Sequence, residues 1–152
     1  MTDHNFADLL DVLATDHAPH TLEEKNQPYT NAPSGGPLVQ HALPALLTAY
    51  HQGKISLEKL VQKACHNPAI LFDIKDRGYV REGFFADLVV LDIDKEFEVV
   101  KKDVLYQCGW SPFEGTQFKG AVERTLLNGK WVYSNGNIHP ESAAMELTFD
   151  RE

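Results

Sequence analysis

Three residues that could do chemistry lie within five positions near the start of the chain. Asp16, His17 and His20 directly follow a short, mostly apolar run, Leu9–Thr15. A carboxylate in such a place can bind a divalent metal ion or take a proton from metal-bound water. A polar turn, in which Asp16 caps the backbone and the histidines are solvated, explains the same residues. The spacing differs from the helix-borne histidine pair of many zinc enzymes, so both interpretations stay open at this point.

The elements around these residues predict how they are held. The run Leu9–Thr15, closed by a polar segment that contains Pro19, is typical of a buried strand that ends in a loop. Residues 21–36 have the charge, proline and glycine content of a long loop, and long loops in compact domains are often functional. Catalytic groups of α/β barrels lie at the carboxyl ends of strands, which is where this pattern puts Asp16.

Helical patterns follow the loop. Apolar residues recur at helical spacing over Leu38–Tyr50, where Pro44 is expected to disturb the helix. Ser56 has the character of an N-cap, and the pattern after it predicts a second helix to about His66. The pair Asn67-Pro68 repeats a start signal, so a short third helix is expected through Phe72.

The pattern changes near Asp76, after which strand signals dominate. The segment Ala86–Asp92 is rich in β-branched residues and predicts a strand. Asn128-Gly129 separates two further strand-like runs and is typical of a type I′ hairpin turn. We therefore expect β-structure over about Tyr79–Tyr133, with a last short strand at Leu147–Phe149.

A single buried strand with three helices has no sheet to join. Its unpaired N–H and C=O groups would be exposed on both edges, which is costly for a free-standing domain. We therefore expect the first half of the chain to belong to a larger fold. In the isolated chain, Leu38, Leu46, Leu47 and the Leu9–Ala14 run should then lack part of their packing partners.

Composition excludes several classes of partner. The 152 residues carry a formal net charge of −8, which disfavours nucleic acid and anionic membranes as partners. Cys65 and Cys108 fit neither a metal-binding spacing nor a disulfide framework. No apolar run reaches the roughly 18 residues that a membrane helix needs. The segment Met1–Asp8 is too polar for a signal peptide, so a cytoplasmic setting is expected.

The motifs resemble those of the dihydroorotase family. The active-site loop of that family is similar to Asp16–Thr21 together with Glu23–Lys25 and Ala32–Gly35. Further stretches resemble the tail of amidohydrolases, and of dihydroorotases in particular: Asn67–Ala69, Gly78–Gly83, Ala86–Asp92 and Ser111–Gly115. The resemblance covers nearly the whole chain and corresponds to the C-terminal third of the family's enzymes.

The resemblance implies an α/β fold in two parts. Residues 1–75 would form the last strand, the active-site loop and helices of a metal-dependent (β/α)₈ amidohydrolase barrel. Residues 76–152 would form the C-terminal part of a composite β-sandwich domain. The implied reaction is the interconversion of N-carbamoyl-L-aspartate and dihydroorotate in pyrimidine biosynthesis, at a binuclear Zn²⁺ site. The implied partners are this small-molecule substrate and the missing N-terminal barrel portion, and a homo-oligomer is compatible with the family.

The resemblance also assigns roles to single residues. Asp16 takes the place of the metal-site aspartate and acts as the general base, which moves a proton from the metal-bridging hydroxide to the leaving nitrogen. His20 matches the residue that contacts the substrate carboxylate. The backbone of Ser34 and Gly35 matches a loop that hydrogen-bonds the substrate. The family commonly has Phe at the position of Ser34, so packing over the substrate ring would differ here.

The implied metal site is incomplete in this sequence. The family takes four histidine ligands and a carboxylated lysine or equivalent acid from earlier strands, and these 152 residues contain no His-x-His motif. We therefore expect an incomplete fragment that is inactive alone and does not hold zinc by itself. Trp110 and Trp131 are expected to pack within the β-structure.

Two other functions remain open. One is another cyclic amidohydrolase, of the allantoinase or hydantoinase type, whose substrates do not present the same carboxylate to His20. The other is a non-catalytic, degenerate amidohydrolase subunit. The retention of Asp16 and His20 argues against the second alternative.

Overall fold

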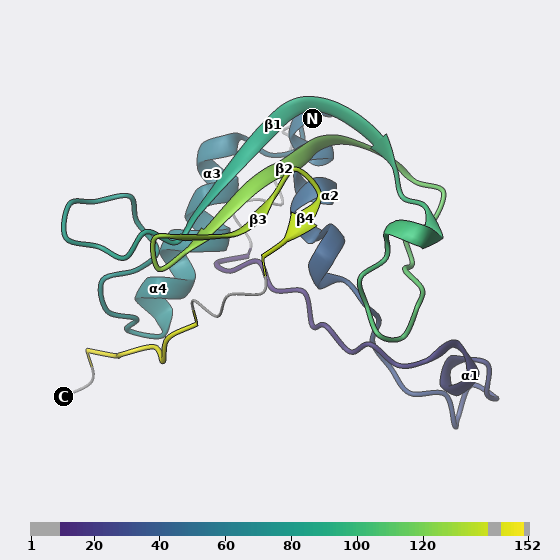
Figure 1. The fold of residues 1–152 in the computed structure, drawn as a ribbon. Coiled ribbons are helices and arrows are strands. Elements are labelled where there is room, and N and C mark those ends of the chain that lie inside the picture. Colours follow the sequence, from purple (N-terminus) through teal and green to yellow (C-terminus); the bar gives the residue numbers. More distant parts are fainter. Residues whose placement is uncertain (1–9, 140–143, 151–152) are drawn as a thin grey trace, which may run out of the picture.

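The computed structural model describes residues 10–139 and 144–150, which form one antiparallel sheet, short helices and long connections (Figure 1). The helices lie beside the sheet, whereas α1 projects from it on a loop. The helical elements are α1 (Leu22–Lys25), α2 (Val39–His51), α3 (Leu57–Val61), the π-helix η2 (Gln62–His66), α4 (Asn67–Leu71) and the 3₁₀-helix η3 (Lys101–Asp103).

The three predicted helices are confirmed. Helix α2 runs through Pro44 as one element. The predicted second helix is α3 continued by η2, and the Ser56 hydroxyl accepts the Lys59 N–H at 3.2 Å as the cap signal indicated. Helix α4 follows with Pro68 in its first turn. The π-helix was not expected, because periodicity does not distinguish a wider turn from an α-helical one.

Four antiparallel strands make the sheet, in the order β1-β2-β3-β4. They are β1 (Leu88–Glu98), β2 (Gln117–Leu127), β3 (Lys130–Ser134) and β4 (Asn137–Ile138). Leu88 pairs with Leu126 at one end of the β1–β2 ladder, and Glu98 pairs with Gln117 at the other. The predicted hairpin turn is confirmed, since Asn128 and Gly129 have φ values of 49° and 78°.

Two limits of the predicted β-structure are wrong. The first strand begins at Leu88 and not near Tyr79, because residues 77–87 form turns held by other contacts. The Phe85 N–H, for example, donates to the Asp76 carbonyl at 3.0 Å. The predicted strand Leu147–Phe149 is reduced to a single bridge between Ile74 and Phe149.

Helix α2 packs on β2 through a very close contact. Leu47 is fully buried, and a Cβ built on Gly120 would lie 2.5 Å from the Leu47 Cβ. The neighbouring Thr48 hydroxyl accepts the Lys119 N–H at 2.9 Å. The other buried apolar residues come from α3, α4, β2 and the residue after β1: Leu60, Ala69, Phe118, Ala121 and Val99. The small core thus joins the first half of the chain to the sheet.

The expected exposure of apolar side chains is met in part. Leu47 contradicts it, because β2 covers this residue completely. Leu38 and Leu46 are half-buried, and Leu10 is 56% exposed. On α4, the neighbouring residues Ile70 and Leu71 are 63% and 62% exposed.

The predicted strand before Asp16 is not a strand here. Leu9 lies outside the described residues, and residues 10–15 join no ladder, because the described chain places no strand beside them. Helical residues bind this segment instead. Leu13 N–H donates to the Lys63 carbonyl at 3.0 Å, and the Lys63 ammonium donates to the Leu10 carbonyl. The side chain of Asn67 donates to the Asp11 carbonyl.

Among the described residues, none of the helices is both long enough and apolar enough to cross a lipid bilayer.

Candidate active site

The candidate site is a loop that turns sharply at Asp16. This residue is exposed and has a φ of 45°, in the left-handed region that Asp and Asn adopt more readily than most residues. Four other Asp or Asn residues among the described ones share this conformation, so it marks a turn and is not in itself a sign of catalysis. The turn ends the extended segment and directs the residues after Asp16 toward residues 34–37.

The loop around Ser34 and Gly35 lies directly on the Asp16–His20 segment. The Ala18 N–H donates to the Gly36 carbonyl at 3.0 Å. A Cβ on Gly35, which has a φ of 85°, would lie 2.6 Å from the Ala18 Cβ, so only glycine fits without displacement. The Lys25 ammonium donates to the Gly35 carbonyl at 3.0 Å. The structure therefore brings the predicted residues Ser34 and Gly35 next to the Asp16 turn.

His17 joins this loop to α2. Its Nδ1 accepts the backbone N–H groups of Leu38 and Val39 at 3.0 and 3.3 Å. Helix α2 has no side-chain cap from Leu38, its own first flanking residue, so His17 satisfies N–H groups that would otherwise lack an intrahelical partner. Because Nδ1 accepts, the proton of the neutral ring is on Nε2. This role was not predicted, because 21 residues separate His17 from Leu38.

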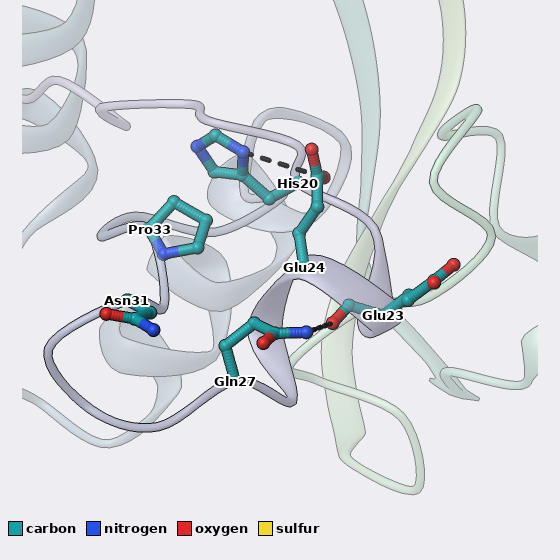
Figure 2. Close-up of a pocket in the computed structure, with 6 residues that line it drawn as sticks. All are labelled: His20, Glu23, Glu24, Gln27, Asn31 and Pro33. Carbon is teal, nitrogen blue, oxygen red and sulfur yellow. Dashed lines mark hydrogen bonds and ion pairs between the residues drawn. The ribbon is translucent and has the colours of Figure 1, made fainter.

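His20 lies at the edge of an open hollow of about 470 Å³ (Figure 2). Its Nδ1 is 3.7 Å from a carboxylate oxygen of Glu24, and its side chain is 36% exposed. Glu24 belongs to the capping box of α1, where hydrogen bonds from the Thr21 backbone N–H and hydroxyl hold the pKa of its carboxyl below the ordinary value. The hollow is lined by six residues, which do not include Asp16, Ser34 or Gly35: His20, Glu23, Glu24, Gln27, Asn31 and Pro33.

The arrangement places the exposed carboxylate of Asp16 and the accessible imidazole of His20 on one loop that backbone contacts hold in place. A carboxylate can accept and return a proton, and an imidazole N–H can donate to an anionic ligand. Across residues 10–139 and 144–150, however, no three His, Cys, Asp or Glu side chains gather in a way that could hold a metal ion. Asp16 therefore does not form a metal site with other side chains of this described part, and a metal there would need ligands from elsewhere.

Trp110 makes a second site contact that our sequence interpretation missed. We expected it to pack within the β-structure, whereas its indole N–H donates to the His20 carbonyl at 2.8 Å. Tyr106 lies nearby, with its ring centroid 5.2 Å from that of His17. The sequence did contain one indication that Trp110 belongs to the site, since this residue directly precedes the motif Ser111–Gly115.

Comparison with known sequences matches the Amidohydrolase family over residues 4–132 of the chain. A dihydroorotase from Halobacterium salinarum is 45% identical over 129 residues, which is 85% of this chain and 30% of that protein. The multifunctional protein pyr1-3 of Dictyostelium discoideum is 37% identical over 131 residues, or 86% of this chain and 6% of that protein. The chain thus spans about 30% of the length of the single-function dihydroorotase.

Among solved structures, the L-hydantoinase (dihydropyrimidinase) from Arthrobacter aurescens is similar with a TM-score of 0.82 and 32% identity. That match covers 89% of this chain and 31% of the hydantoinase. The mixed helices and strands described above are therefore part of an amidohydrolase barrel enzyme's fold, as the sequence analysis expected.

Proposed function

Because the chain belongs to the amidohydrolase family, we propose that it supplies the C-terminal part of a dihydroorotase-type enzyme. Such an enzyme interconverts N-carbamoyl-L-aspartate and dihydroorotate by closing and opening a cyclic amide. The observation that carries the proposal is the Asp16–His20 loop, which is pinned to Gly35 and Gly36 within a chain 45% identical to a dihydroorotase.

We assign proton transfer to Asp16. In ring opening, an attacking water oxygen forms a bond to the amide carbonyl carbon and its proton passes to the Asp16 carboxylate. The C–N bond then breaks, and the same proton goes to the leaving nitrogen. An exposed carboxylate on a sharp turn is suited to this exchange, because it is accessible and can approach both atoms in turn.

We assign substrate orientation to His20, Ser34 and Gly35. The imidazole of His20 is accessible at the hollow and would donate a hydrogen bond to the substrate carboxylate. The backbone at Ser34 and Gly35 would hydrogen-bond the ring. The contacts of Gly35 with Ala18 and Lys25 support this assignment, because a loop fixed before binding loses less freedom when it orients a ligand.

The same proposal divides the chain into the two parts that the resemblance implies, a barrel part and a β-sandwich part. Residues 1–75 would complete a (β/α)₈ barrel, and residues 76–152 would belong to a β-sandwich. Members of the family generally use a metal. We propose Zn²⁺ bound by Asp16 and by ligands of the remaining barrel portion, because the described residues do not gather a set of ligands. That portion would also supply the strand neighbours that residues 10–15 lack.

A chimera tests the function. The 129 matched residues of the Halobacterium salinarum dihydroorotase would be replaced by those of this chain, and ring opening would be followed by ultraviolet absorbance. The chimera should open dihydroorotate. Asp16→Asn should lower kcat by about 10²–10⁴-fold with little change in KM, because it removes the base and keeps the shape. His20→Ala should raise KM by roughly 10- to 150-fold, the equivalent of 1.5–3 kcal/mol for a charged hydrogen bond.

Two control variants distinguish these roles from the general effect of removing a carboxylate or an imidazole from the chain. Asp94→Asn removes an exposed carboxylate on β1, and His51→Ala removes an exposed histidine at the end of α2. Neither should change kcat or KM by more than about 2-fold. An Asp16→Asn chimera with normal kcat would contradict the assigned base. A folded but inactive chimera would favour the non-catalytic alternative.

The structural likeness to a hydantoinase favours one second candidate, a hydrolase of hydantoins or dihydropyrimidines. These substrates do not offer the carboxylate that we assign to His20. Under the second candidate, His20→Ala would leave KM for dihydroorotate unchanged, and the chimera would open hydantoin or dihydrouracil faster than dihydroorotate.

A further inference from the structure

The connection between β1 and β2, residues 99–116, reaches from the sheet to the loop that carries the candidate site (Figure 1). At its far end the Trp110 indole N–H donates to the backbone carbonyl of His20 at 2.8 Å, in a partly buried position. The two residues are 90 positions apart. The contact therefore joins the second half of the chain to the loop of the candidate site.

The connection is itself fixed on α2 at a second point. The Tyr106 hydroxyl accepts the Gln40 N–H at 2.7 Å, and the Tyr106 ring lies against that of His17. The side chain of Gln40 donates to the Asp103 carbonyl and accepts the Leu105 N–H, both at 2.8 Å. Trp110 thus belongs to a segment that several hydrogen bonds hold in place, so its indole can fix the position of the backbone that it contacts.

The bond from Trp110 is directional. An indole has one N–H and no acceptor, so it fixes the direction of the carbonyl that it meets. The His20 peptide group lies between two other fixed points. Before it, the Ala18 N–H binds Gly36, and after it, Thr21 caps α1. Any large apolar side chain could fill the space next to His20, but only a donor fixes this peptide plane.

We propose that Trp110 is a positioning residue that sets the backbone at His20 and thereby aims the imidazole into the hollow. The inference rests on the proposed function, in which His20 binds the substrate carboxylate. It adds a residue from the second half of the chain to the positioning of the site. It also gives residues 99–116 a role beyond connecting two strands.

Nuclear magnetic resonance of the full chain tests this proposal without turnover. The sequence has two tryptophans, Trp110 and Trp131, and the second is 45% exposed. The indole N–H of Trp110 should exchange with solvent more slowly than that of Trp131. In Trp110→Phe, the carbonyl carbon resonance of His20 should move upfield. The amides of Ala18 and His20 should exchange about 2- to 12-fold faster, the factor that one net hydrogen bond represents.

Trp131→Phe is the matched control and should leave the His20 carbonyl and both amides unchanged. Unchanged exchange of the β2 amides in Trp110→Phe would show that the effect is local and the chain still folded. Equal exchange of the two indole protons would overturn the proposal, as would a His20 carbonyl that does not move in Trp110→Phe. If that variant does not fold, the indole comparison in the unchanged chain decides. An inactive chimera would count against the proposed reaction and not against these contacts.

Discussion

Replacing Gly120 by alanine tests how α2 is fixed on the sheet. Gly120 has a φ of 102°, and a Cβ there would lie 2.5 and 2.8 Å from Cβ and Cδ1 of Leu47, which is fully buried. A positive φ costs a residue with a Cβ about 1–2 kcal/mol. Overpacking of a filled core costs a further 1–3 kcal/mol, roughly. The free energy of unfolding should therefore fall by about 2–5 kcal/mol, a large share of the roughly 5–15 kcal/mol typical of a domain.

The assay is urea unfolding followed by circular dichroism, with Gly53→Ala as the matched control. Gly53 also has a positive φ, 70°, but a Cβ there would meet no atom within 4 Å. It should therefore lose only the conformational cost of about 1–2 kcal/mol. The double variant Gly120→Ala/Leu47→Ala keeps the Leu47 Cβ but removes Cγ and Cδ1, two of the three side-chain atoms that the new Cβ would meet. Its cost should therefore be smaller than the sum of the two single costs.

Two results would refute this reasoning. The first is a Gly120→Ala variant that loses no more stability than Gly53→Ala. The second is strict additivity in the double variant, which would mean that Gly120 and Leu47 do not share the contact. Either result would imply that α2 and β2 pack differently from the arrangement described here.

Three further predictions concern metal, pH and a buried ion pair. The isolated 152-residue chain should hold less than one tightly bound zinc after dialysis and should not open dihydroorotate, because catalytic zinc needs about three protein ligands. Metal analysis and the ultraviolet assay check this, and one chelator-sensitive zinc per chain with turnover would contradict it. Burial lowers the pKa of His41 from 6.5, because it disfavours the charged form of the ring in the folded state. The contribution of His41 to the free energy of unfolding is therefore complete above pH 6.5 and is lost as the pH falls through 6.5 toward the lower native pKa. Urea unfolding between pH 8 and 5 should show a shallower pH dependence in His41→Gln, and an unchanged slope would refute this. Arg77→Met should cost about 1.5–3 kcal/mol, because the buried guanidinium bonds Asp87 and Asn128. A loss below 0.5 kcal/mol, roughly the scale of surface substitutions, would contradict that pairing.

Local signals predicted most of the regular structure. The cap at Ser56, the start signal Asn67-Pro68 and the turn Asn128-Gly129 each act within a few residues, and the structure contains all three. The expected strand before Asp16 depended on neighbours far along the chain, and the described residues provide none. Residues 10–15 have the composition of a buried strand, but a ladder needs a second strand, and side chains from η2 and α4 bind the segment instead.

In the candidate site too, local motifs could be predicted from the sequence, whereas contacts between distant residues could not. The Asp16–His20 motif and the loop at Gly35 were identified from the sequence, and the structure places them in contact. His17 as the cap of α2 and Trp110 as the anchor of His20 were not foreseen, because these contacts span 21 and 90 residues. A single sequence gives no measure of which distant residues meet, since composition and periodicity describe only neighbours.

The contacts around α2 explain why the sheet and the candidate loop should respond to each other. Helix α2 meets β2 through Leu47, and its first turn binds His17, the residue next to Asp16. The β1–β2 connection returns to the same loop through Trp110. A displacement of α2 would therefore move one anchor of the loop relative to the other. Because packed elements shift as units and do not deform continuously, such a change should alter the position of the Asp16–His20 segment as well as the stability of the core.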